Sequence, residues 1–308
     1  MDKPLYFFAK TLVLLLQALP LKLVARIGRA GGAIFYWLDA RHRKVALKNL
    51  HLCFKAEKTT EEIRAIAREN FRRIGENYAC AVKTAAMTPD ELIPHFNFVG
   101  SEKILPYAHK APKNCIVAIG HFGNFELYVR FGQFVPDFTC ATTYRGLRQP
   151  SLNRLMQSLR ERSGCLFFER RTGAAALKFA MNESGMLLGL LADQHAGNHG
   201  LRIPFFGHEC STSAAPAVFA LRYHCPLHTA ICYRVGLAEW CIEAGDEIPT
   251  QENGRARSTE QIMADVNRVF ENAIRRDPAN WFWVHNRWKP RTSKSRAPKN
   301  SGSQVMES

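Results

Sequence analysis

The pattern in this sequence best suited to chemistry is His121 followed by Glu126, within Gly120-His-Phe-Gly-Asn-Phe-Glu126. On a continuous helix this spacing corresponds to about 140° of rotation, so the two side chains would diverge. Gly120 and Gly123 would let the backbone turn and bring them together. The carboxylate would then hold one imidazole nitrogen, and the other nitrogen would act as a general base. The alternative is a polar loop whose side chains satisfy backbone groups, because His-x4-Glu alone is a weak pattern.

No Ser or Cys in this segment is an obvious nucleophile. In general acid–base catalysis the side chain moves a proton and the attacking atom can belong to a substrate. We therefore expect the nucleophile to be a group of the substrate.

A second reactive group, Asp193, follows the apolar run 186–192. An unpaired carboxylate at the end of a buried strand costs free energy, so Asp193 needs a partner. Arg160 or a backbone turn could supply it. A purely structural role in capping a turn is the alternative.

Two histidine pairs have the spacing of a zinc-binding helix, His195/His199 and His224/His228. The first pair lies in a Gly-containing segment and the second spans Pro226, so neither lies on a clean helix. No His-Glu-x-x-His pattern accompanies them, and no Gly-rich fingerprint for a dinucleotide or a phosphate loop is present. The sequence therefore predicts no metal site and no cofactor.

Short apolar runs alternate with helical patterns after Gly100. We predict strands at 115–119, 138–144, 165–168, 186–192 and 227–235 with an edge strand at 239–248, and helices at 124–132, 151–162, 172–182, 213–224 and 259–275. This alternation predicts an α/β fold with a central, mainly parallel sheet flanked by helices. Sites in such sheets form beyond the carboxyl ends of strands, where His121 and Asp193 would lie.

The N-terminal run 5–19 is apolar apart from Lys10, Thr11 and Gln17. It is shorter than the about 20 residues that a membrane-spanning helix needs. A cleaved signal peptide fits poorly, because no small-x-small site precedes Pro20. We expect either a membrane-embedded anchor helix with snorkelling ends or an amphipathic element in the membrane interface. An ordinary buried helix is the alternative. The basic residues that follow favour contact with the cytoplasmic face of a membrane.

The net charge of +15 is concentrated at the two ends of the chain: residues 1–50 carry +7, residues 285–308 carry +5, and residues 51–284 carry only +3. This distribution argues against a nucleic-acid channel. We divide the chain into an N-terminal hydrophobic and basic segment (1–50), an α/β domain (51–289) that begins with a helical lead-in capped at Thr59, and a tail (290–308) expected to be disordered. Nine scattered cysteines without a Cys-x-x-Cys pair indicate reduced thiols in a cytosolic setting.

The segment His121–Glu126 resembles the His-x4-(Asp/Glu) motif of the bacterial lipid A late acyltransferases, the lauroyl/myristoyl transferase family of the lysophospholipid-acyltransferase-like superfamily. Further blocks resemble that family in the same order: Thr143-Tyr-Arg145, Ser158-Leu-Arg-Glu-Arg-Ser-Gly164, Asp193-Gln-His-Ala-Gly197, Ile203-Pro-Phe-Phe-Gly207, Ser211-Thr212 and Trp283-Val-His-Asn-Arg-Trp-Lys289. The hydrophobic N-terminus is also a feature of the family.

The resemblance implies acyl transfer from a thioester, carried by acyl carrier protein or coenzyme A, to a hydroxyl of a lipid A precursor at the cytoplasmic side of the inner membrane. It implies that His121 is the general base and that Glu126 orients it. Arg160 and Asp193 match functional residues of the family. Arg160 would pair with a phosphate or a developing oxyanion, and Asn124 and Arg145 would support substrate binding. Transfer to another glycolipid, such as a phosphoinositide mannoside, a non-catalytic lipid-binding role and hydrolysis are the alternatives.

Overall fold

The computed structural model describes residues 2–107, 113–135, 138–183 and 185–290. Within these residues the central sheet has seven strands in the order β1-β9-β8-β2-β5-β3-β4. Their bounds are β1 Phe96–Val99, β2 Cys115–Ile119, β3 Thr139–Tyr144, β4 Leu166–Glu169, β5 Met186–Leu191, β8 Leu227–Gly236 and β9 Glu239–Ala244. Only β8 and β9 pair antiparallel, and every other neighbouring pair is parallel. The predicted α/β fold with a mainly parallel sheet is therefore confirmed.

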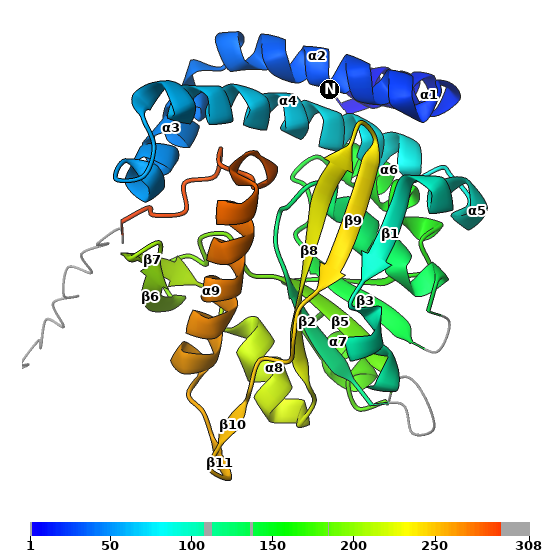
Figure 1. Cartoon of the computed structure of the whole chain (residues 1–308). Coiled ribbons are helices and arrows are strands. Elements are labelled where there is room, and N and C mark those ends of the chain that lie inside the picture. The colour runs from blue at the N-terminus through cyan, green and yellow to red at the C-terminus, as the bar shows by residue number, and fades with distance from the viewer. Residues whose placement is uncertain (1, 108–112, 136–137, 184, 291–308) are drawn as a thin grey trace, which may run out of the picture.

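The prediction that 239–248 forms an edge strand is wrong, because β9 lies between β1 and β8 (Figure 1). The edge strand next to β9 is β1, a four-residue strand that the sequence pattern did not indicate. Such a short run carries too little periodicity to be recognised, and only its pairing with β9 reveals it. The predicted tail begins at 290 and therefore lies, apart from that residue, outside the described residues.

Helices cover both faces of the sheet. They are η4 Phe125–Gln133, α6 Pro150–Glu161, α7 Ala174–Ala180, α8 Ala215–Tyr223 and α9 Thr259–Arg276, with η4 a 3-10 helix where an ordinary helix was predicted. The remaining short elements are α5 Pro89–Leu92, η1 Ile93–His95, η2 Ser101–Lys103, η3 Leu105–Tyr107, η5 Pro278–Asn280 and the hairpins β6 Leu201–Phe205 with β7 His208–Thr212 and β10 Gln251–Glu252 with β11 Arg255–Ala256. Alternate side chains of β2 point to opposite faces of the sheet and enter two different hydrophobic cores. Ile116 and Ala118 pack with α8 and α9, whereas Val117 and Ile119 pack on the face covered by η4.

Four N-terminal helices lie across one end of the sheet (Figure 1). They are α1 Asp2–Ala18, α2 Leu21–Leu38, α3 Ala40–Phe54 and α4 Thr60–Thr84. The predicted capping box at Thr59 is present at the start of α4. Helix α2 packs closely along α4, because a Cβ on Gly28 would lie only 2.5 Å from the carbonyl oxygen of Gly75. The predicted boundary at residue 50 lies within α3 and stays a prediction.

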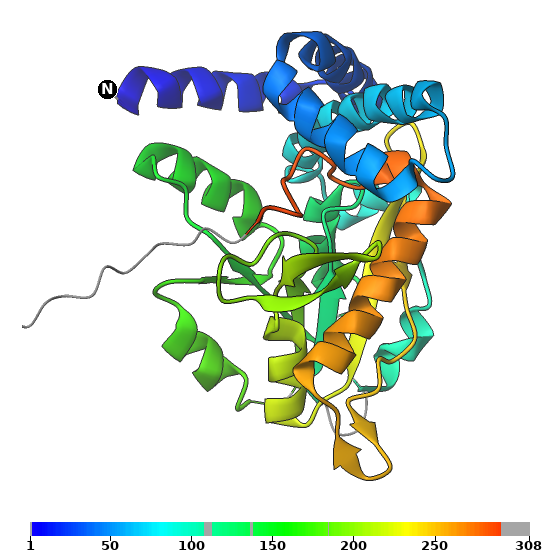
Figure 2. The same cartoon turned by 90° about the vertical axis from the view of Figure 1, so that its left-hand side faces the viewer.

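Helix α1 projects from this group and contacts α6 (Figure 2). Large apolar side chains of α1 and α2 are exposed: Leu5, Phe7, Phe8, Leu12, Leu14, Leu15, Leu23, Ile27, Ile34, Phe35, Trp37 and Leu38. No helix among the described residues combines the length and the hydropathy that crossing a membrane requires.

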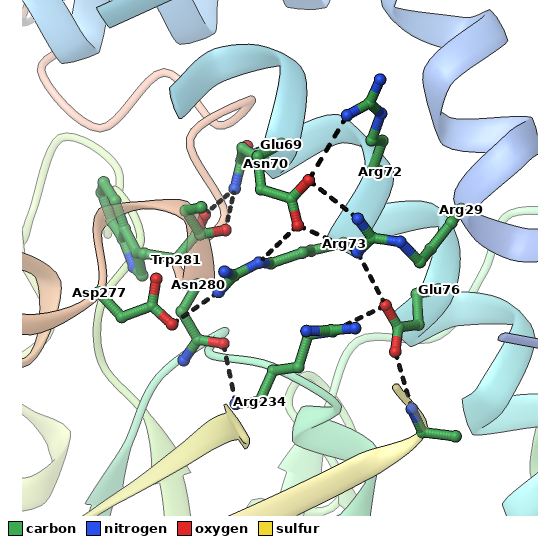
Figure 3. Close-up of polar contacts among 12 residues, drawn as sticks. Arg29, Glu69, Asn70, Arg72, Arg73, Glu76, Arg234, Asp277, Asn280 and Trp281 are labelled. Carbon is green, nitrogen blue, oxygen red and sulfur yellow. Dashed lines mark hydrogen bonds and ion pairs between the residues drawn. The ribbon is translucent and has the colours of Figure 1, made fainter. Parts of the chain in front are cut away.

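A network of charged side chains joins α2 and α4 to β8 and to Asp277 at the end of α9 (Figure 3). Its members are Arg29, Glu69, Arg72, Arg73, Glu76, Arg234 and Asp277. Glu76 is its most buried member. It accepts hydrogen bonds from Arg29 (3.1 Å), from Arg234 (2.8 Å) and from the backbone N–H of Ala238 (3.0 Å). Paired charges therefore fix α2 and α4 to the sheet.

Candidate active site

His121 and Asp193 meet at the carboxyl end of the sheet. Strands β2 and β5 are parallel neighbours in which Ile119 lies opposite Leu191, so the residues two positions further on leave the sheet side by side. Nδ1 of His121 lies 2.9 Å from Oδ1 of Asp193, and the backbone N–H of His121 donates to Oδ2 at 2.9 Å. The partner that Asp193 requires is therefore His121, not Arg160.

Asp193 is completely buried, yet it is held as a carboxylate. Burial alone would raise its pKa. The charge of His121 and the hydrogen bonds from His121 and from Nε1 of Trp281 (2.8 Å) outweigh burial and lower the pKa to about 2. An ionised carboxylate can only accept, so Nδ1 of His121 carries the proton. In the neutral imidazole, the other ring nitrogen, Nε2, then has no proton and can accept one from a substrate.

Aromatic rings enclose the imidazole of His121. The ring centroids of Phe125 and Phe282 lie 4.8 and 5.9 Å from its centroid. The side chain of Tyr78 packs edge-on against both of these phenylalanines. This packing restricts rotation of the imidazole.

Glu126 contacts Arg160 instead of His121. The guanidinium of Arg160 donates from Nε at 3.1 Å and from Nη2 at 2.6 Å to the two carboxylate oxygens. Arg160 also lies over the ring of Phe167, 5.3 Å from its centroid. The sequence-based pairing of Glu126 with His121 is thus corrected: Glu126 lies in the first turn of η4 and faces the end of α6.

A cavity of about 560 Å³ extends from His121 over the face of the sheet that η4 covers. Glu126, Arg145, Arg160 and His285 supply polar groups to it. Most of the remaining wall is apolar and includes Phe98, Ile104, Val117, Ile119, Val129, Phe131, Phe167, Leu187, Leu191, Ala230 and Ile242. A cavity of this volume, with a mostly apolar wall and a few polar groups, suits a small amphipathic ligand.

The structure separates the two predicted substrate-binding residues, Asn124 and Arg145. Arg145 is exposed and lines the cavity. Asn124 is only 1 % exposed and does not line it, and neither atom of its amide has a partner among the described residues. A role for Asn124 in binding substrate therefore stays a prediction.

Sequence reasoning missed Trp281 and the asparagines that hold its segment. Nδ2 of Asn70, from α4, donates to the carbonyls of Ala279 and Trp281. Nδ2 of Asn49, from α3, donates in the same way to the carbonyls of Trp283 and His285. Helices α3 and α4 therefore position the segment from which Trp281 reaches Asp193. The aromatic motif at 283–289 was the one signal in the sequence for this region.

His285 and Arg287 from that motif support the turn after β5. Nε2 of His285 accepts a hydrogen bond from the backbone N–H of His195 (2.9 Å), which requires a neutral ring. Burial lowers the pKa of His285 to about 4, despite the opposing effect of Asp193. Arg287 is fully buried and donates to the carbonyls of Gln194 and Ser211 and to the hydroxyl of Thr212.

The two histidine pairs noted in the sequence, His195/His199 and His224/His228, do not belong to a larger set of metal ligands among the described residues. In the part of the chain that the structure describes, no group of three or more His, Cys, Asp or Glu side chains could hold a metal ion.

Comparison with known proteins assigns the family. The family model for bacterial lipid A biosynthesis acyltransferases matches residues 2–290. The chain is 27 % identical over 284 residues to the lipid A biosynthesis palmitoleoyltransferase of Escherichia coli (strain K12), covering 89 % of this chain and 87 % of the relative. The lipid A biosynthesis acyltransferase of Shigella flexneri has the same identity and coverage. The lipid A biosynthesis lauroyltransferase of Escherichia coli (strain K12) is 25 % identical over 284 residues, with coverages of 90 % and 89 %. With a match that spans nearly all of its length, this chain belongs to the family of bacterial lipid A biosynthesis acyltransferases.

Proposed function

We propose that this protein transfers a fatty acyl chain from an acyl thioester to a hydroxyl of a lipid A precursor, with His121 as the general base. The hydrogen bond between His121 and Asp193 carries the proposal, because it leaves Nε2 as the basic nitrogen. Nε2 takes the proton of the acceptor hydroxyl while its oxygen attacks the thioester carbonyl. The C–S bond then breaks, and the leaving thiolate takes the proton back from the imidazolium. The substrate supplies the nucleophile, so no acyl-enzyme forms.

Asp193 and Glu126 have different roles in this mechanism. Asp193 holds the tautomer of His121 and stabilises the imidazolium, as the carboxylate of a catalytic triad does. Glu126 holds Arg160 at the cavity wall through two hydrogen bonds. Arg160 has further N–H donors, which would stabilise the oxyanion or contact a phosphate of the acceptor. Glu126 is thus proposed to act through Arg160, as a positioning residue.

The apolar part of the cavity is proposed to bind the acyl chain. It begins beside His121, so a chain placed in it would present its thioester carbonyl near Nε2. The ion pair of Glu126 and Arg160 also lines this cavity. This arrangement supports a donor with an apolar tail and a reactive polar head.

An acyl carrier protein is the proposed donor, with coenzyme A as the alternative. Five exposed arginines lie in the segment after β3, on α6 and in the turn after β4, and Arg145 and Arg170 among them line the cavity: Arg145, Arg148, Arg154, Arg170 and Arg171. None of them forms an ion pair among the described residues. A cluster of exposed positive charges would attract an acidic protein or a phosphorylated carrier.

We further propose that α1 and α2 attach the protein to the cytoplasmic face of the inner membrane. Their exposed apolar side chains, with Lys22 and Arg26 close by in sequence, suit an amphipathic element in the interface of an anionic bilayer. Replacing Phe7, Phe8 and Trp37 by serine should release the protein from vesicles that contain anionic lipid. Phe179→Ser is the matched control, since this side chain is 72 % exposed on α7. Equal binding by the two variants would contradict this attachment.

The catalytic proposal is tested with the purified full chain, an acyl-acyl carrier protein and a lipid A precursor. His121→Ala should abolish transfer and keep the fold, whereas His199→Ala, at an exposed loop histidine, should retain it. Near-normal transfer by His121→Ala would refute the mechanism. Mass spectrometry of lipid A from a strain that lacks the protein should reveal one missing acyl chain. Unchanged lipid A with an altered second glycolipid would instead favour the other acceptor.

A further inference from the structure

We infer that Gly189 determines which acyl chain lengths the cavity accepts. The inference rests on the proposed acyl transfer and names a specificity-determining residue within its binding site. Gly189 lies in the middle of β5, in the run Met186-Leu-Leu-Gly-Leu-Leu191, and it lines the cavity.

The fold does not require glycine at this position. Gly189 is absent from the residues with positive φ, so other residues can adopt its backbone conformation. An added Cβ would meet Cδ1 of Ile119 at 3.4 Å and the carbonyl oxygen of Ala141 at 3.8 Å, which are ordinary contacts. By contrast, a Cβ on Gly28 would overlap the backbone of α4. Close packing therefore explains Gly28 and does not explain Gly189.

Glycine inside a strand reduces stability, and it often marks a place where a ligand approaches the backbone. The alternation along β5 places that approach on the cavity side. Leu187, Gly189 and Leu191 line the cavity, whereas Leu188 and Leu190 are buried in the core on the opposite face. Gly189 therefore leaves a gap between two leucines in the cavity floor.

The gap lies partway along the path from His121 into the cavity. Gly189 is opposite Val117 on β2 and Thr142 on β3. The level of Ile119 and Leu191, next to His121, is about 7 Å away along the strands at about 3.3 Å per residue. Leu187 lies about the same distance further in. An acyl chain bound with its carbonyl at His121 would pass over Gly189 before its distal carbons reach Leu187.

A side chain at position 189 should therefore shorten the usable cavity. Alanine adds one methyl group that the site can hold, whereas valine and leucine would occupy space that the distal part of a long chain needs. A shorter chain extends less far beyond this level, so it should lose less of its binding. The expected result is a graded shift of donor preference toward shorter chains, in the order alanine, valine, leucine.

The test compares octanoyl, lauroyl and palmitoyl donors on acyl carrier protein, with a lipid A precursor as acceptor. For each variant, kcat/KM for the longest donor that the natural protein uses is divided by kcat/KM for the shortest donor. For Gly189→Leu, we expect this ratio to fall by about tenfold or more. Gly31→Leu is the matched control, because a Cβ on Gly31 meets nothing within 4 Å and lies on α2. It should leave the ratio unchanged. Unchanged ratios in Gly189→Val and Gly189→Leu would overturn the inference.

A second measurement keeps this test separate from the proposed function. Binding of the matching free fatty acids, followed by calorimetry, reports on the cavity even if no transfer occurs. If the natural protein transfers no acyl chain from any donor, the proposed function fails, and fatty-acid binding alone then decides the role of Gly189. If Gly189→Leu does not fold, the alanine and valine variants decide it, with thermal melting as the control for folding.

Discussion

His121 and Asp193 are joined by two hydrogen bonds, one from the imidazole and one from the backbone N–H of the same residue. The carboxylate therefore fixes both the ring and the turn that presents it. Trp281 adds a third donor from the C-terminal segment, so three parts of the chain converge on one buried carboxylate. Glu126, nearer in sequence, forms its ion pair with Arg160.

Asp193→Asn should lower kcat by about 10³-fold or more, because an amide no longer holds the tautomer of His121 or stabilises its protonated form. The substitution nearly preserves the volume, so the thermal melting temperature should change far less than activity does. Steady-state kinetics with purified donor and acceptor measure the effect. A loss below about tenfold would mean that His121 does not depend on this carboxylate.

Glu126 and Arg160 should behave as one unit in a double-mutant cycle. We expect Glu126→Gln and Arg160→Met each to reduce kcat/KM, and the double variant to lose little more than Arg160→Met alone, with a coupling energy of about 1–3 kcal/mol. The reason is that the only hydrogen bonds of the Glu126 side chain among the described residues join it to Arg160. Additive losses would show that Glu126 acts independently of Arg160, as in the pairing with His121 first expected from the sequence.

Glu76→Gln should lower the free energy of unfolding by about 3–5 kcal/mol, because it removes one charge from a buried network and leaves Arg29 and Arg234 poorly compensated. Urea denaturation measures the loss. Glu61→Gln is the control: both Glu61 and its partner Arg64 are exposed, and their atoms are 3.7 Å apart, so its effect should stay below about 0.5 kcal/mol. Equal effects of the two substitutions would contradict the conclusion that the network fixes α2 and α4 to the sheet.

His285 should make the protein less stable in acid. Its pKa is about 4 in the folded protein, below the ordinary histidine value of about 6.5. Between these values the unfolded chain binds more protons, so stability falls as pH decreases from about 6.5 to about 4. His285→Gln should reduce the loss of unfolding free energy between pH 7 and pH 5 by about 1 kcal/mol, after allowance for partial exposure. Denaturant melts at both pH values test this, and an unchanged difference would contradict it.

Much of the fold was predictable because its signals are local. The strands at Cys115–Ile119 and Met186–Leu191 are continuous apolar runs, and the capping box at Thr59 is complete within four positions. Strand β1 was missed because four residues carry little periodicity, and the position of β9 inside the sheet depends on that missing strand.

The sequence by itself determined the family motifs, the strand-end location of His121 and Asp193, and the apolar and basic character of the N-terminus. The tertiary structure decided which carboxylate meets the histidine. Proximity along the chain favoured Glu126, but strand order places β5 beside β2, and that pairing brings Asp193 to the imidazole. The same pairing sets Gly189 in the cavity floor. Strand order and register arise from contacts between distant segments, which no local pattern of residues encodes.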